Sequence, residues 1–91
     1  MRYFLKPQQD KRKTFSNKAE IEETENKAVL FSYLTPVCEI DKKAKTFKLN
    51  NKVKSELLFS NTTLRHIREF LYQFGINTDT SKKALMNGAK K

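Results

Sequence analysis

The sequence predicts a small α+β domain, in which an antiparallel meander of four or five strands packs against one C-terminal amphipathic helix. Residues 28–49 are rich in β-branched and aromatic types and are broken by polar turns, which is typical of short strands. Residues 60–75 carry apolar side chains at helical spacing. An amphipathic helix and a half-apolar sheet bury their apolar faces against each other, which gives a two-layer sandwich.

The length of the chain suits one domain. A chain of 91 residues, of which 37% are hydrophobic, buries only about 60–65% of its unfolded surface. We therefore expect no deep internal active-site cavity. We place the α+β domain at residues 13–75, between a basic N-terminal arm at 1–12 and a basic tail or short helix at 76–91.

The first strands are expected on either side of a polar turn. Residues 13–22 alternate weakly, and residues 27–33 alternate strongly after the turn at 23–26. Thr35-Pro36 predicts a bend or an edge because proline cannot donate to a strand ladder, and a strand resumes at Val37–Asp41.

A hairpin follows over residues 41–49. Asp41-Lys42-Lys43-Ala44 forms a polar turn, and the next strand places Phe47 and Leu49 on one side. Asn50-Asn51 suits another turn. Residues 53–59 fit either a last strand or a buried helical entry, and the pattern alone does not separate the two.

The helix at 60–75 has a capped start and a glycine stop. Ser60, Asn61 or Thr62 can accept from the first-turn N–H groups, and Gly75 supplies the left-handed C′ position. The core face is expected to hold Leu64, Ile67, Phe70, Leu71 and Phe74. The outward side is expected to hold Arg65, Glu69, Tyr72 and Gln73, flanked by His66 and Arg68.

The two terminal segments carry further basic residues. The arm is densest at Lys11, Arg12 and Lys13. The tail contains a short capped helix candidate at 82–86, whose Leu85 and Met86 are placed to dock on the core.

The charge balance favours a polyanionic partner. There are 19 basic and 10 acidic residues, which gives a net charge of +9. The strongest basic element is the hairpin at 41–54, with Lys42, Lys43, Lys45, Lys48, Lys52 and Lys54 against the single Asp41. Arg65, Arg68 and Tyr72 share the outward half of the helix. We predict that these residues bind a nucleic-acid backbone or the acidic surface of a host protein.

Catalytic motifs are not evident. The chain has one histidine, one cysteine and two glycines, so neither a metal-ligand set nor a phosphate-cradling loop can be assembled, and no cofactor is expected. A Cys38/His66 nucleophile pair is conceivable, but a His66 that bonds locally at the helix flank is favoured. We expect a non-catalytic protein.

Cellular location follows from cysteine usage and from apolar runs. A single cysteine allows no intrachain disulfide, which suits a reducing cytoplasm. The apolar run within the first seven residues is too short for the core of a signal peptide. No apolar stretch elsewhere approaches the length that is needed to span a membrane.

Two motifs resemble a group of small uncharacterised proteins of bacteriophages and mobile elements. One is the strand Ser32-Tyr33-Leu34-Thr35-Pro36-Val37, which matches Ser-Tyr-x-Thr-x-Val apart from Pro36 in the strand; the other is the helix start Thr62-Thr63-Leu64-Arg65-His66. The similarity spans residues 13–75 and implies a phage-like setting, without an assigned activity. It also opens the alternative of a phage-encoded inhibitor that binds a host protein, such as a CRISPR nuclease or another nucleic-acid enzyme.

Overall fold

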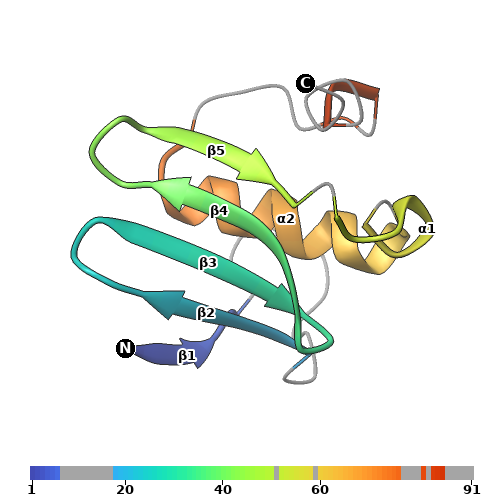
Figure 1. The fold of residues 1–91 in the computed structure, drawn as a ribbon, viewed down its shortest axis with the longest axis horizontal. Coiled ribbons are helices and arrows are strands. Elements are labelled where there is room, and N and C mark those ends of the chain that lie inside the picture. Colours follow the sequence, from blue (N-terminus) through green and yellow to red (C-terminus); the bar gives the residue numbers. More distant parts are fainter. Residues whose placement is uncertain (7–17, 51, 59, 77–80, 82, 86–91) are drawn as a thin grey trace.

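The computed structural model describes residues 1–6, 18–50, 52–58, 60–76, 81 and 83–85. It contains one sheet in front of one long helix (Figure 1). The strands are β1 Arg2–Phe4, β2 Ala19–Glu23, β3 Lys27–Ser32, β4 Thr35–Asp41 and β5 Thr46–Leu49. The helices are α1 Ser55–Leu58 and α2 Asn61–Gln73. The predicted α+β class, with a meander and a C-terminal helix, is confirmed.

The five strands are antiparallel and lie in the sheet in their sequence order. Ile21 pairs with Leu30 and Leu30 pairs with Cys38, so one face of the sheet carries buried apolar side chains. Phe31 pairs with Glu20 and with Pro36 on the other face, which the described helices do not cover. Residues two apart share a face, so this alternation orients the whole sheet.

The helix α2 packs against β3 and β4 (Figure 1). Ile67, Phe70 and Leu71 are fully buried, and Phe74 packs at the edge of the core. Phe70 and Phe74 meet edge to face, with ring centroids 5.1 Å apart. The predicted core face of this helix is therefore confirmed.

Both ends of α2 follow the predicted capping. The Ser60 hydroxyl accepts from the N–H of Thr63 at 3.2 Å, which identifies Ser60 as the N-cap. Gly75 has φ +71°, and Ile76 N–H donates to the Leu71 carbonyl at 2.9 Å. This bond closes a Schellman motif, in which glycine meets no Cβ penalty.

The N-terminal segment differs from the expected arm. Residues 2–4 form the edge strand β1, Leu5 is buried, and the Met1 carbonyl accepts from Glu23 N–H at 2.7 Å. A three-residue strand carries little sequence signal and forms here because β2 offers an open edge. Residues 7–12, which include Lys11 and Arg12, and residues 13–17, the first part of the predicted strand, lie outside the described residues.

The chain reverses two residues earlier than predicted. Tyr33 and Leu34 form the turn between β3 and β4, while Pro36 lies inside β4. Proline is tolerated there because the β3–β4 register shifts at Leu30/Phe31, and because β5 pairs only from Cys38 onward. Of the bend or edge expected at Thr35-Pro36, the bend was wrong, because the turn lies at Tyr33–Leu34, whereas Pro36 does lie where β4 has no β5 partner.

The ambiguous segment before α2 is helical. Ser55–Leu58 form α1, whose Leu58 is buried and whose start is marked by the N–H of Leu58 donating to the Lys54 carbonyl at 2.9 Å. Residues 83–85 form one further helical turn that buries Leu85, in agreement with the predicted docking of that side chain. Met86 lies outside the described residues.

The outward side of α2 is more buried than its pattern predicts. Glu69, expected to face solvent, is fully buried, and Gln73 donates to it at 2.7 Å. Gln73 also donates to the Lys6 carbonyl at 2.6 Å, so the segment after β1 reaches this side of the helix. His66 is buried as well, not placed at a solvated flank.

Candidate nucleic-acid interface

Five exposed lysines lie within or beside the end strand β5. Lys43 and Lys45 lie in the turn before it, Lys48 lies within it, and Lys52 and Lys54 come directly after it. We call these five residues the basic edge. A four-residue strand rises about 13 Å, so the ammonium groups are spread along one border of the sheet.

The turn before β5 is shaped by Asp41. Its Oδ1 accepts from the N–H groups of Lys43 and Ala44, both at 3.0 Å. The Asp41 carbonyl accepts from Lys45 N–H at 3.0 Å, and Lys45 adopts φ +57°. The acidic side chain is thus engaged by the backbone, while both lysine side chains remain exposed.

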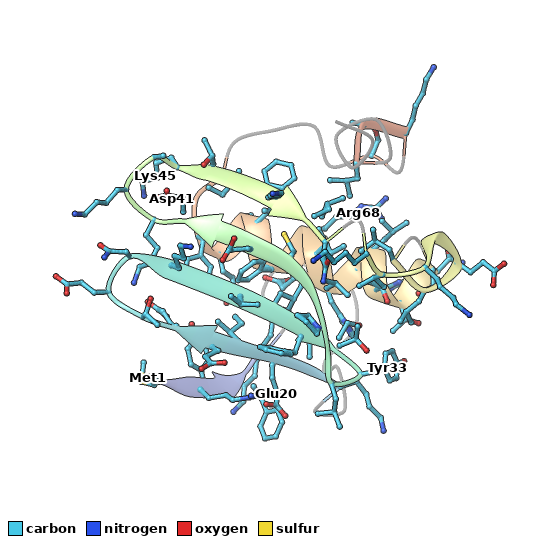
Figure 2. All side chains as sticks on the ribbon, in the orientation of Figure 1. Met1, Glu20, Tyr33, Asp41, Lys45 and Arg68 are labelled. Carbon is cyan, nitrogen blue, oxygen red and sulfur yellow. The ribbon has the colours of Figure 1, made fainter. Side chains whose placement is uncertain are left out.

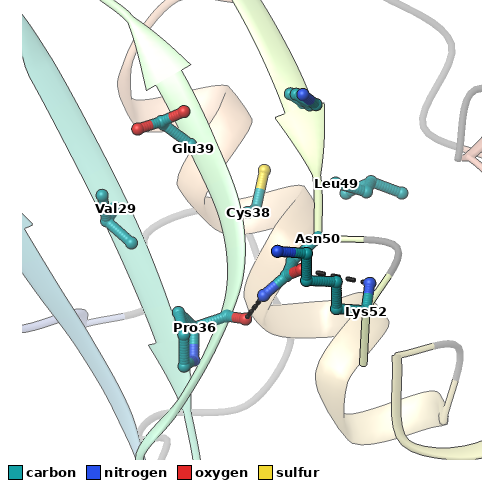
Figure 3. Close-up of a pocket in the computed structure, with 8 residues that line it drawn as sticks. Val29, Pro36, Cys38, Glu39, Leu49, Asn50 and Lys52 are labelled. Atoms are coloured by element: carbon teal, nitrogen blue, oxygen red, sulfur yellow. Dashed lines mark hydrogen bonds between the residues drawn. The ribbon is translucent and has the colours of Figure 1, made fainter. Parts of the chain in front are cut away.

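Asn50 plays the equivalent part after β5. Its Nδ2 donates to the Pro36 carbonyl at 2.9 Å, and its Oδ1 accepts from Lys52 N–H at 3.1 Å (Figure 3). Asn50 N–H also donates to the Val37 carbonyl at 2.9 Å. These bonds fix the chain that carries Lys52 to the start of β4.

The charges of the basic edge are not neutralised locally. In the part of the chain that the structure describes, no ion pair involves any of these five lysines. The ion pairs found join Arg2 to Glu20 and Glu22, Lys27 to Glu39, and Lys42 to Glu23. Three of these paired acidic residues lie on β2, and the fourth, Glu39, lies opposite Lys48 but is paired with Lys27.

Lys42, unlike the lysines of the basic edge, forms an ion pair. Its ammonium group lies 2.6 Å from Glu23 and donates to the Thr24 carbonyl at 3.0 Å, so it ties the β2–β3 turn to the β4–β5 turn. The Tyr3 hydroxyl also donates to Glu23, at 2.7 Å. The Lys42 ammonium, then the Tyr3 hydroxyl, hold the pKa of Glu23 below its ordinary value.

The open face of the sheet is mixed in charge. The register places Arg2, Glu22, Val29, Glu39 and Lys48 in one row across the strands. The Arg2 guanidinium lies 4.4 Å from the centroid of the Phe31 ring. One face of this ring is thus occupied, whereas Phe4, which shares this side of the sheet through its pairing with Glu20, is 44% exposed.

A hollow opens on the sheet between the start of β4 and the end of β5 (Figure 3). Its volume is about 280 Å³. Its walls include the apolar side chains of Val29 and Pro36, and its lining also includes two lysines of the basic edge, Lys48 and Lys52. Leu49 lines it as well, although its side chain is buried on the core face opposite Cys38. The remaining lining residues are Cys38, Glu39 and Asn50.

One comparison with known proteins gives a match. Residues 3–87 match a family described as a family of unknown function, DUF8033. The chain belongs to this DUF8033 family. The match runs from within β1 to beyond the last described helical turn. Neither the curated proteins nor the solved structures contain a match to the chain.

In this DUF8033 chain, the predicted binding residues of α2 (Arg65, Arg68 and Tyr72) lie apart from the turn between β4 and β5, where the basic edge begins. Figure 2 shows Lys45 at the turn end of the β4–β5 hairpin and Arg68 well away from it. Arg65 and Arg68 are half-buried and each has an interaction partner, whereas Tyr72 is 56% exposed. The structure therefore does not join all predicted binding residues into one patch, and Lys11, Arg12 and Lys13 lie outside its described part.

A buried polar cluster joins the DUF8033 sheet to its helix. Ser32 Oγ lies 2.8 Å from His66 Nδ1 and 3.3 Å from Thr63 Oγ1, and all three residues are buried. Burial also raises the pKa of the Cys38 thiol above its ordinary value, which disfavours a thiolate. These observations give no support to a Cys38/His66 nucleophile pair.

The β3–β4 turn is the feature of this DUF8033 chain that sequence reasoning missed. Tyr33 and Leu34 have φ +52° and +68°, a conformation that is common for glycine, is seen for asparagine and is rare for bulky L-residues. Their side chains are 47% and 75% exposed. The paired alternation on both sides was the available signal, but the absence of an Asn-Gly dipeptide hid the turn.

Two further observations limit the chemistry of the described residues. Within those residues, no three side chains of His, Cys, Asp or Glu are grouped to hold a metal ion. None of the helices described is both long enough and apolar enough to cross a membrane.

Proposed function

We propose that this protein binds nucleic acid through the basic edge and contacts the phosphate backbone. One observation carries the proposal: five exposed lysines lie within or beside the border strand β5, and none of them forms an ion pair with another described residue. Unpaired ammonium groups attract polyanions and release their counterions on binding. This is a non-catalytic role, and lysine contacts of this kind position a protein without reading bases.

The experiment compares two variants of equal charge. Lys45→Gln/Lys54→Gln removes one charge from each end of the basic edge, and Lys6→Gln/Lys18→Gln removes two exposed charges elsewhere. Binding to labelled DNA and RNA, single-stranded and duplex, is measured by fluorescence anisotropy over a range of salt concentrations. The first variant should lower the slope of log K against log salt by about 1.5–2, whereas the control should leave the slope near that of the wild type.

Two outcomes would overturn the proposal. One is the absence of binding below about 10 μM at low salt, where basic proteins normally retain nucleic acid. The other is an equal loss of affinity in both variants, because total charge and not the basic edge would then be responsible.

A second candidate function is binding to a host protein, as in a phage-encoded inhibitor of a CRISPR nuclease or another nucleic-acid enzyme. The exposed Tyr33–Leu34 turn favours it, since a non-glycine pair at positive φ stores strain and presents an aromatic anchor. A purified host protein that binds the wild type, fails to bind Leu34→Asp and shows little salt dependence would support it. Equal binding of wild type and Leu34→Asp would remove the turn from consideration.

A further inference from the structure

The hollow at the β4–β5 border is built by the backbone of the sheet. The β3–β4 register shifts next to Pro36, and β5 pairs with β4 only from Cys38 onward, which leaves a gap in strand pairing between the start of β4 and the end of β5. Asn50 bridges the gap by its hydrogen bonds to the Pro36 and Val37 carbonyls, at 2.9 Å each (Figure 3). The hollow is therefore framed by hydrogen-bonded strands.

Its lining combines two kinds of surface. Val29 and Pro36 give it apolar walls, and Lys48 and Lys52 add two ammonium groups that have no ion-pair partner in the described part of the chain. A group that fits this lining has an apolar body and carries negative charge beside it. A nucleobase flanked by backbone phosphates has this chemistry.

Glu39 is the acidic residue in the lining, and its charge is offset. Its carboxylate lies 3.6 Å from the Lys27 ammonium. Two unpaired lysines thus face the hollow beside one paired carboxylate, so an approaching phosphate meets a net positive charge.

The volume sets the size of the occupant. About 280 Å³ lies just below the usual range for drug-sized ligands, so the hollow suits one base and not a larger ligand. A base within a duplex is paired and stacked, and it reaches such a hollow only after costly extrusion. An unpaired base enters without that cost.

We propose that the hollow receives one unpaired base, so that the protein prefers single-stranded to duplex nucleic acid. This inference rests on the proposed nucleic-acid function and adds its substrate class. Lys48 and Lys52 hold the phosphates on either side of the base, and Val29 and Pro36 exclude water from its ring.

The test fills the hollow without changing charge. Val29→Phe adds volume at a half-buried position that lines the hollow, and Thr46→Phe is the control on the same open face outside the hollow. Affinities for an oligonucleotide of about 12 nucleotides, single-stranded and as a duplex, are measured at one salt concentration. The wild type and Thr46→Phe should prefer the single strand by about tenfold, and Val29→Phe should lose this preference while its duplex affinity is kept.

A second measurement needs no variant. A single-stranded oligonucleotide with a photoreactive base is cross-linked to the wild type, and the attached peptide is identified by mass spectrometry. Attachment within β3, β4 or residues 48–52 supports the proposal, and attachment confined to other segments overturns it. This arm covers the case in which Val29→Phe does not fold.

The outcomes distinguish the unpaired-base inference from the proposed nucleic-acid function on which it rests. Equal affinity for single strand and duplex, or an unchanged preference in Val29→Phe, overturns the unpaired-base inference while nucleic-acid binding stands. Displacement of the oligonucleotide by a free nucleoside monophosphate at similar concentration also overturns it, because the hollow would then be a mononucleotide site. No binding of either form overturns the proposed function itself.

Discussion

Ser32 on β3 and His66 on α2 share a buried hydrogen bond, with 2.8 Å between Ser32 Oγ and His66 Nδ1. The bond links the sheet layer to the helix layer at a point where both side chains are shielded from water. Such a polar contact fixes the relative position of two elements because neither group finds water as a substitute.

Replacing Ser32 tests this link. Ser32→Ala leaves a buried ring nitrogen of His66 without that partner, so we expect a loss of about 1–3 kcal/mol in the free energy of unfolding. Urea denaturation measures the loss. The exposed Thr46→Ala should change stability by less than about 0.5 kcal/mol, and a similarly small effect of Ser32→Ala would contradict the assigned role.

Replacing the strained turn should stabilise the protein. The pair Tyr33→Asn/Leu34→Gly suits a two-residue hairpin turn with positive φ, and we expect a gain of about 1–2 kcal/mol. Leu34→Ala is the matched control: it removes the exposed apolar side chain but keeps a non-glycine residue at φ +68°, so it should bring no gain. A lower melting temperature of the double variant would show that Tyr33 and Leu34 are not strained.

Replacing Glu69 distinguishes a buried carboxylate from a solvated one. Glu69→Ala removes the acceptor of the Gln73 hydrogen bond and leaves a space at a fully buried position, so it should cost about 1–3 kcal/mol. Tyr72→Ala, on the exposed side of the same helix, is the control and should cost clearly less. Chemical denaturation measures the free energy of unfolding of both variants. Equally small losses of stability in the two variants would place Glu69 at the surface.

The pairing of Glu23 with Lys42 predicts a pH dependence of stability. Because the folded-state pKa of Glu23 is lowered, its stabilising contribution is present above the ordinary value of 4.5 and is lost as the pH falls through the folded-state pKa. The wild type should therefore exceed Glu23→Gln in stability at pH 7, and the difference should shrink on acidification. Urea denaturation at several pH values measures it.

The control for this pH dependence lies in the same turn. Glu25 is exposed, and Glu25→Gln should differ little from the wild type at every pH. A stability difference between the wild type and Glu23→Gln that stays constant from neutral to acidic pH would contradict the assigned ion pair.

Local chemistry determined much of the fold. Ser60 and Gly75 end a helix by capping, and Phe47 and Leu49 alternate with polar residues, so both elements could be predicted from neighbours in sequence. The candidate site was predictable to the same degree, because the lysines of residues 43–54 are dense in any conformation. Their freedom from ion pairs was not predictable, since that depends on where the acidic strands lie.

Tertiary structure decided the remaining features. A helical period tells which residues share a face, but not how many elements pack on the helix, so the burial of Glu69 and His66 followed from contacts with the sheet and with the segment at Lys6. The Lys42–Glu23 pair and the hollow beside Pro36 also depend on strand register. The sequence by itself determined the elements and the surplus of positive charge; only pairing between distant segments determined which charges stay unpaired and where the surface is hollow.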